Sequence, residues 1–141
     1  MSVGSLCRRE VHVAGLGESV RAVAQRMREH NVGTVVVRDE KERPAGILTD
    51  RDLVLRVMAE DKDPRLTPVL EVMTVVPRSV SEGTPLEVAL GLMRSQKCRR
   101  LPVVGSDGKL VGLLSLDDVL ELLAEEFGTS GRLVRAESPR D

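Results

Sequence analysis

Apolar positions in the first half of the chain predict a helix followed by a β-hairpin. Four of them recur at the i, i+3, i+4, i+7 spacing of an amphipathic helix: Val20, Val23, Ala24 and Met27. Ser19 stands just before this run, where an N-cap is expected. The runs at 34–37 and 46–49 are largely β-branched or apolar, which is typical of buried strands. The polar stretch at 38–45 predicts the turn that joins them.

Flanking segments complete a unit of five elements. Val11 and Val13 alternate with their neighbours and predict a short strand before the helix. Residues 52–58 predict a second helix after the hairpin, so the order is strand, helix, strand, strand, helix. The segment 69–74 predicts a further short helix that leads into the second half.

The second half repeats this order. When the chain is shifted by 66 positions, residues 19–58 fall on residues 85–124 without a gap. Only six of the forty aligned positions are identical, yet the apolar pattern and the turn residues keep the same register. Asp107 and Gly108 mark the hairpin turn of the second copy. Neither half has enough apolar face to stand alone, so we expect the copies to pack as one domain.

The repeat predicts an α/β module made of four segments. We expect 11–60 to form the first repeat and 76–127 the second. Residues 61–75 are expected to connect them and to include the short helix, and residues 128–141 to form a flexible tail.

Composition excludes several classes of function. The chain has 141 residues, 41% hydrophobic and 30% charged, and a net charge of −1. With no Trp, no Tyr and one Phe, it offers neither a basic surface nor stacking platforms for nucleic acid. No apolar window has the length of a membrane span or a secretory signal. Cys7 and Cys98 are too few for a disulfide framework. We therefore expect a cytoplasmic protein that binds neither nucleic acid nor membrane.

No catalytic constellation emerges from the sequence. Nucleophile-elbow, Walker and dinucleotide-binding glycine motifs are all missing from it. His12 and His30 are not spaced with a cysteine or carboxylate as a metal pair would be. We expect no enzymatic activity, no metal site and no required cofactor. A metal sensor would need His12, His30, Cys7 and Cys98 to meet in the fold.

One polar element occurs in both copies: a strand that ends in a hydroxyl residue and is followed, three residues later, by an aspartate that begins a helix. The pairs are Thr49 with Asp52 and Ser115 with Asp118. As capping boxes, they would satisfy free N–H groups at the helix start. As a ligand site, the same helix start would hold a phosphate while the carboxylate accepts hydrogen bonds from ribose hydroxyls. The spacing leaves both interpretations open.

The two copies resemble a tandem pair of cystathionine-β-synthase (CBS) domains, an arrangement often called a Bateman module. The resemblance rests on the helix patterns, the middle strands and the strand-to-helix endings: Val20–Met27 and Leu86–Met93, 34–37 and 101–104, Gly46–Asp52 and Gly112–Asp118. It covers about residues 11–125 and is greatest to short stand-alone pairs. It implies two β-α-β-β-α units related by pseudo-two-fold symmetry, with sheets packed face to face, and a homodimer formed through helices.

The resemblance also implies a regulatory function. CBS pairs often bind AMP, ADP, ATP or S-adenosylmethionine between their units and change shape or partner binding in response. In the cleft that ends in copy two, it places Asp118 at the ribose and Ser115 near the ribose or phosphate. Arg99 and Arg100 would meet phosphates, to which guanidinium groups are suited. The adenine would lie against the other copy, near four residues: Val13, Val32, Gly33 and Thr34.

The cleft that ends in copy one keeps Thr49 and Asp52 but lacks the arginine pair. Phosphate affinity there would depend on backbone N–H groups or on Arg51. We therefore expect the Asp118 cleft to be the better nucleotide site.

Two alternatives remain at this point. Arg99 and Arg100 could simply form a solvated helix end that complements the helix dipole. The whole chain could be a structural or protein-interaction CBS protein that binds no nucleotide, with Asp52 and Asp118 serving only as helix caps.

Overall fold

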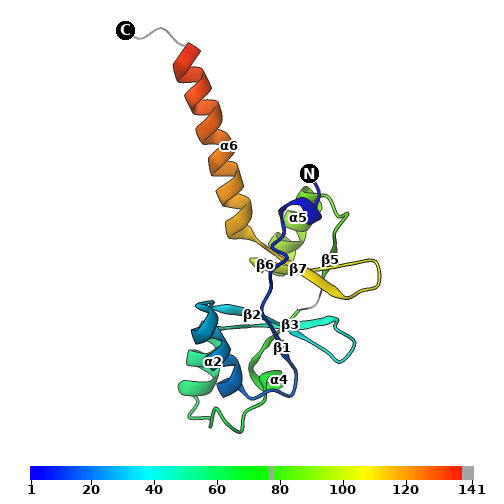
Figure 1. The fold of residues 1–141 in the computed structure, drawn as a ribbon, viewed down its shortest axis with the longest axis vertical. Helices are drawn as coiled ribbons and strands as arrows, with labels where there is room; N and C mark the ends of the chain where they lie inside the picture. Colours follow the sequence, from blue (N-terminus) through cyan, green and yellow to red (C-terminus); the bar gives the residue numbers. More distant parts are fainter. Residues whose placement is uncertain (77, 138–141) are drawn as a thin grey trace.

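The computed structural model describes residues 1–76 and 78–137, with side chains up to residue 128. It contains the two predicted repeats (Figure 1). The first consists of β1 (Val13–Gly15), α2 (Val20–His30), β2 (Thr34–Arg38), β3 (Pro44–Thr49) and α3 (Asp50–Leu53), which continues as a π-helical turn, Val54–Met58. The second consists of β5 (Val80–Ser81), α5 (Leu86–Gln96), β6 (Arg100–Val104), β7 (Leu110–Ser115) and α6 (Leu116–Glu137). The predicted order of elements is confirmed.

Each repeat builds a mixed sheet with the same pairing. β1 is parallel to β2, and β2 is antiparallel to β3. The second repeat pairs β5 with β6 and β6 with β7 in the same senses. The first sheet has a fourth strand, β4 (Thr74–Val75), antiparallel to β3. The turn between β6 and β7 has Gly108 at φ +80°, as the predicted Asp-Gly hairpin requires.

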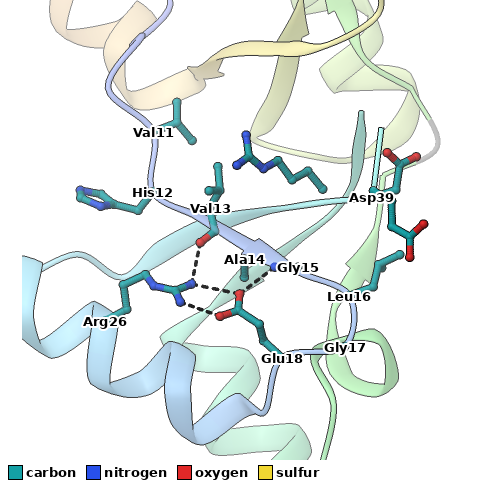
Figure 2. A pocket seen from close by; sticks show the side chains of 12 residues that line it. Val11, His12, Val13, Ala14, Gly15, Leu16, Gly17, Glu18, Arg26 and Asp39 are labelled. Carbon is teal, nitrogen blue, oxygen red and sulfur yellow. Dashed lines mark hydrogen bonds and ion pairs between the residues drawn. The ribbon is translucent and has the colours of Figure 1, made fainter. Parts of the chain in front are cut away.

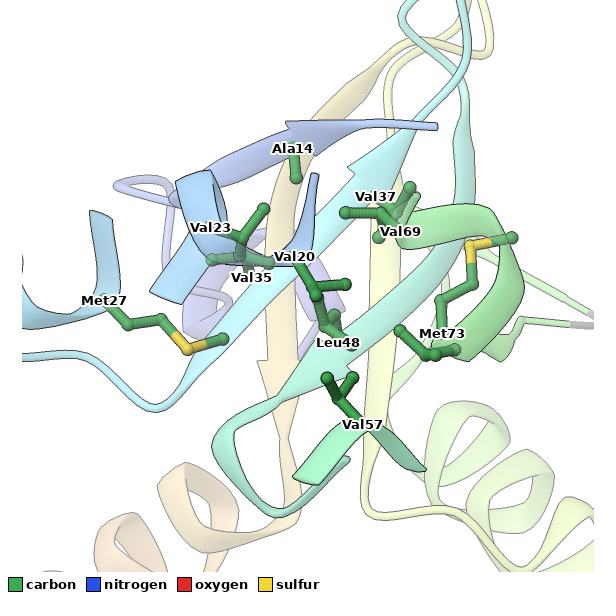
Figure 3. Close-up of a cluster of buried hydrophobic side chains, with 11 residues drawn as sticks. Ala14, Val20, Val23, Met27, Val35, Val37, Leu48, Val57, Val69 and Met73 are labelled. Carbon is green, nitrogen blue, oxygen red and sulfur yellow. The ribbon is translucent and has the colours of Figure 1, made fainter. Parts of the chain in front are cut away.

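One face of each sheet is covered by the helices of its own repeat, together with a short helix from the segment that leads into the other repeat. In the first repeat, the two sides meet in a cluster of buried apolar side chains (Figure 3): Ala14, Val20, Val23, Met27, Val35, Val37, Leu48, Val57, Val69, Val72 and Met73. The second cluster has the equivalent composition: Val3, Val80, Ala89, Met93, Leu101, Val103, Leu114 and Val119. Ser19 caps α2 as predicted, because its hydroxyl accepts a hydrogen bond from the Ala22 N–H.

The opposite faces of the two sheets pack against each other. Side chains alternate along a strand, so Val36 and its cross-strand partner Ile47 point away from the first cluster. Val36 is nevertheless fully buried. Pro102 and Leu113 hold the same positions in the second sheet. The two hairpins also meet, since the Leu110 N–H donates to the Glu42 carbonyl at 2.9 Å. The fold is the face-to-face α/β pair that the resemblance implied.

The segment that leads into each repeat packs on the other repeat. The N-terminal helix α1 (Val3–Leu6) lies beside α5, and the chain then runs across to β1 (Figure 1). Val3 is buried in the second cluster. The equivalent helix α4 (Val69–Val72) places Val69 in the first cluster. We call residues 3–8 and 69–74 the exchanged segments. Because each packs on the repeat that it does not lead into, together they join the two repeats into one structure.

The backbone of each exchanged segment passes so close to a strand that the strand residue facing it has no room for a side chain and is glycine. A Cβ at Gly46 would lie 2.8 Å from the Thr74 carbonyl oxygen, and one at Gly112 would lie 2.8 Å from the Arg8 carbonyl oxygen. This explains the glycine that opens each strand-to-helix ending in the sequence.

Three elements differ from expectation. The exchanged segment α1 and strand β4 were not predicted, because elements of four and two residues carry no readable period. The closing helix α6 continues through Glu137, where a tail was expected from residue 128. Glycines weaken a helix by about 1 kcal/mol each but do not end it, and the next proline is Pro139. The remainder of the expected tail, 138–141, lies outside the described residues.

Candidate functional site

A cavity of about 350 Å³ lies where the two repeats meet. It is lined by residues of the N-terminal segment, the end of α2 with the start of β2, and the strand-to-helix ending of the second repeat: Arg8, Glu10, Val11, His12, Asn31, Val32, Gly33, Thr34, Arg100, Leu113, Ser115, Asp117 and Asp118. Six of the sequence-predicted site residues are therefore brought together.

Asp118 is held in this cavity by its own helix start and by a distant arginine. Its backbone N–H donates to the Ser115 hydroxyl at 3.1 Å. Its carboxylate accepts three hydrogen bonds from Arg8, at 2.8 Å from Nη2 and at 3.0 and 3.2 Å from Nε. The Asp118 side chain is 12% exposed, whereas that of Arg8 is 70% exposed. These hydrogen bonds, followed by the charge of Asp118, raise the pKa of the Arg8 guanidinium.

The two predicted phosphate-binding arginines are separated by the structure. Arg100 lines the cavity. No ion pair engages it within the part of the chain that the structure describes. Arg99 does not line the cavity, and its Nη2 instead donates to Asp117 at 2.9 Å. Because successive residues at a strand start point to opposite sides, only one of the pair enters the cavity.

The wall facing Asp118 comes from the first repeat. Val32, Gly33 and Thr34 follow the left-handed residue Asn31 that ends α2. A Cβ at Gly33 would lie 2.8 Å from a carboxylate oxygen of Asp50, an exposed side chain that would have to move aside. The fourth residue expected on this wall, Val13, lies elsewhere, in a neighbouring hollow.

That hollow, of about 660 Å³, lies along β1 (Figure 2). Arg26 donates to the Val13 carbonyl at 2.7 Å and to Glu18 at 2.6 Å, while the Gly15 N–H donates to Glu18 at 2.7 Å. The pKa of Glu18 is lowered, chiefly by its hydrogen bond from Arg26. This pair satisfies the free edge of β1 and so blocks the addition of a further strand.

The first-repeat ending is folded on itself. The Thr49 N–H donates to Asp52 at 3.0 Å, and the Asp52 N–H donates to the Thr49 hydroxyl at 3.2 Å, which completes a capping box. Arg56 approaches the Asp52 carboxylate at 3.9 Å. Arg51 is exposed. Neither of the two hollows is lined by Thr49, Arg51 or Asp52.

The residues weighed as metal ligands meet only in part. The rings of His12 and His30 stack with centroids 4.5 Å apart. Cys7 and Cys98 pack against the second apolar cluster instead, and burial raises the pKa of the Cys7 thiol. No group of three or more His, Cys, Asp or Glu side chains suited to a metal occurs among the described residues. None of the described helices is both long and apolar enough to span a bilayer.

Sequence reasoning missed the contribution of the N-terminal segment to the cavity. Four of its residues line it: Arg8, Glu10, Val11 and His12. The 66-residue offset, extended backwards, aligns residues 3–8 with 69–74. Since 69–74 was predicted to contain a short helix, this alignment could have indicated that residues 3–8 also belong to the fold. The equivalent of Arg8 is then Thr74, which pairs with Ile47 as Arg8 pairs with Leu113.

Comparison with known proteins agrees with this architecture. The uncharacterized protein MK0525 of Methanopyrus kandleri is 37% identical over 122 residues, which are 86% of this chain and 62% of that protein. A crystal structure of Hypoxic Response Protein I with two coordinated zinc ions superposes with a TM-score of 0.75 at 28% identity, covering 86% of this chain and 98% of that one.

Two further solved structures contain nucleotides. The CBS domain protein PAE2072 from Pyrobaculum aerophilum, complexed with AMP, gives a TM-score of 0.73 at 28% identity and covers 88% of this chain and 99% of that one. The cytosolic domain of the Mg²⁺ channel MgtE, in complex with ATP, gives 0.72 at 32% identity and covers 86% and 48%. The CBS domain model itself matches residues 3–59 and 69–125, two spans that begin with the exchanged segments. The chain therefore belongs to the CBS domain family, as a tandem pair.

Proposed function

We propose that this chain is a non-catalytic sensor that binds an adenosine-containing ligand in the Asp118 cavity. The observation that carries the proposal is the convergence of six predicted residues on one cavity between the repeats: Val32, Gly33, Thr34, Arg100, Ser115 and Asp118. The bound AMP and ATP of two similar structures support the same ligand class. A volume of about 350 Å³ lies within the range of about 300–1,000 Å³ usual for small-molecule sites.

The chemistry of the lining assigns a role to each side. The first-repeat wall at 32–34 offers an apolar and backbone surface for the adenine. Asp118 offers a carboxylate for ribose hydroxyls. Arg100 offers a cation for phosphate. Ligand contacts to both repeats would then change how they pack, and so the surface that a partner meets.

The cleft of the first repeat is proposed as a weaker site. It would use Thr49, Asp52 and Arg51, but Asp52 is already engaged by its capping box. None of the three lines either hollow described above. The position equivalent to Arg100 is the uncharged Thr34.

Isothermal titration calorimetry tests the proposal. Ligand-free protein would be titrated with AMP, ADP, ATP and S-adenosylmethionine, and at least one should bind. Asp118→Asn should weaken that binding by about 10- to 100-fold, the usual effect of losing a hydrogen bond to a charged group. Asp52→Asn is the matched comparison, because it makes the same change in the proposed weaker site and should leave the tighter binding event unchanged. No binding of any of the four by folded protein would refute the proposal.

The opposing candidate is a structural or interaction protein without a nucleotide. The Arg8–Asp118 ion pair favours it, because that pair satisfies the carboxylate without any ligand. In that case both aspartate variants would change stability alone.

The proposed assembly is a homodimer. Large apolar side chains are exposed on the last helix of each repeat: Val54, Leu55 and Met58, and Leu120, Leu123 and Phe127. Figure 1 shows α6 extending away from the sheets, so its outer face is open to a second copy. Sedimentation of the wild type against Leu120→Asp with Leu123→Asp tests this, and a wild-type monomer would refute it.

A further inference from the structure

The Asp118 carboxylate already has an occupant from within the chain. The Arg8 guanidinium donates to both of its oxygens, at 2.8 to 3.2 Å, and both residues line the cavity. The contact joins residues 110 positions apart, so it is no local helix-surface pair.

The backbone of Arg8 is fixed independently of this ion pair. Its N–H donates to the Leu113 carbonyl and its carbonyl accepts from the Leu113 N–H, both at 2.9 Å. The side chain, by contrast, is 70% exposed. Arg8 can therefore release Asp118 by side-chain rotation while the segment stays paired with β7.

A ribose bound through Asp118 would need the same oxygens. Arg8 donates to both carboxylate oxygens, and the Asp118 side chain is only 12% exposed, so little of it is left for further donors. The Ser115 hydroxyl is engaged as well, since it accepts from the Asp118 N–H. Ribose and guanidinium thus compete for one acceptor.

We propose that Arg8 is an internal competitor for Asp118, which an adenosine-containing ligand must displace in order to bind. This rests on the function proposed above and adds its regulation. The apparent affinity for the ligand is proportional to the fraction of molecules in which Arg8 has released the carboxylate. Arg8 has no counterpart at the equivalent position of the first repeat, where Thr74 stands. The arginine near Asp52 is Arg56 of the same helical segment, at 3.9 Å.

An uncharged ligand gives the clearest test, since a released Arg8 could also attract phosphate. Adenosine would be titrated calorimetrically into the wild type, Arg8→Gln and Arg8→Lys. Arg8→Gln should bind adenosine about 2- to 5-fold more tightly, because the competing state is removed. Arg8→Lys should be intermediate, since an ammonium lacks the bidentate fork. The matched control is Arg9→Gln, which removes the same charge one residue away, where the partner is Glu82. It should bind adenosine like the wild type.

Ionic strength supplies a second readout that a merely structural arginine would not move. Salt screens an exposed ion pair, so raising it from about 50 to about 300 mM should tighten adenosine binding to the wild type. The affinity of Arg8→Gln should stay constant.

Equal or weaker adenosine binding by folded Arg8→Gln would overturn the competition and leave the proposed nucleotide site standing. If neither the wild type nor any variant bound adenosine, AMP, ADP, ATP or S-adenosylmethionine, the proposed function would fail and the competition with it. Binding by Arg8→Gln alone would support both.

Discussion

The two strand-to-helix endings carry the same motif and use it differently. In both, a hydroxyl accepts the aspartate N–H, from Asp52 to Thr49 and from Asp118 to Ser115. The Asp52 carboxylate then turns back to the Thr49 N–H, whereas the Asp118 carboxylate turns to Arg8. Their side chains are similarly buried, 15% and 12% exposed, so burial does not cause the difference.

Neighbours outside the motif decide its use. One exchanged segment places Thr74 beside the first strand-to-helix ending, and the other places Arg8 beside the second. The strand start supplies Thr34 in one repeat and Arg100 in the other. A duplicated motif has thus become a helix cap in one copy and a cavity acid in the other.

The largest predicted loss of stability comes from the apolar cores, where we expect equivalent substitutions in the two repeats to have equal effects. Leu48 and Leu114 are equivalent and fully buried. Leu48→Ala and Leu114→Ala should each lower the free energy of unfolding by about 2–5 kcal/mol. Because the exchanged segments join the cores, urea unfolding followed by circular dichroism should remain a single transition. Two separate transitions would show that the repeats unfold independently.

The next effect concerns the close passage of the exchanged segments. Gly46→Ala and Gly112→Ala should each cost about 1–3 kcal/mol, since a Cβ would press on a backbone carbonyl. Gly17→Ala and Gly83→Ala are the matched controls, because a Cβ there meets nothing within 4 Å. Thermal melts of the four variants would compare them, and equal melting temperatures would contradict the crowding.

Replacing each aspartate in turn should show that Asp52 stabilises the fold as a helix cap and that Asp118 contributes less to stability. Asp52→Ala breaks the reciprocal capping box and should cost about 0.5–2 kcal/mol. Asp118→Ala loses an ion pair with an exposed arginine and should cost only about 0–1 kcal/mol. Chemical denaturation measures both, and the reverse order would mean that Asp118 is the structural residue.

The smallest effect concerns an ion pair that only the first repeat has. The second repeat carries Thr84 and Leu92 where the first has Glu18 and Arg26. Since Arg26 lowers the pKa of Glu18, the pair stabilises the fold above the ordinary glutamate pKa, and this contribution is lost as the pH falls through the lowered value. At neutral pH, Glu18→Gln should cost at most about 1 kcal/mol. The difference from wild type should shrink as the pH falls below the ordinary glutamate pKa and disappear once it has passed the lowered pKa of Glu18. A difference that persisted in acid would assign the effect to the amide itself.

The sequence predicted the elements with a clear period and missed those that depend on tertiary contacts. Helix α2 and the hairpin strands carry enough repeating apolar positions to be recognised alone. α1 has four residues and is held by Val3, which is buried in the distant repeat. α6 runs beyond its expected end because weak helix formers are not terminators.

The site could be predicted as far as its motif extends. Ser115 and Asp118 lie at the junction of β7 and α6, and the wall at 32–34 leads into β2; both regions line one cavity. Whether Arg99 or Arg100 enters the cavity depends on strand orientation, which a sequence does not show. Arg8 lies 110 residues from its partner, so only the fold could reveal the contact. The ligand roles of all these residues stay predictions.

The exchanged segments also bear on synthesis. Residues 3–8 are synthesised long before β7, the strand beside which they lie, which is complete only at residue 115. The first repeat in turn stays incomplete until residues 69–74 have emerged. A fragment that ends at residue 60 would expose Val3 and lack Val69. The second repeat without residues 3–8 would likewise lack Val3, so we expect neither repeat to reach its native fold when expressed alone.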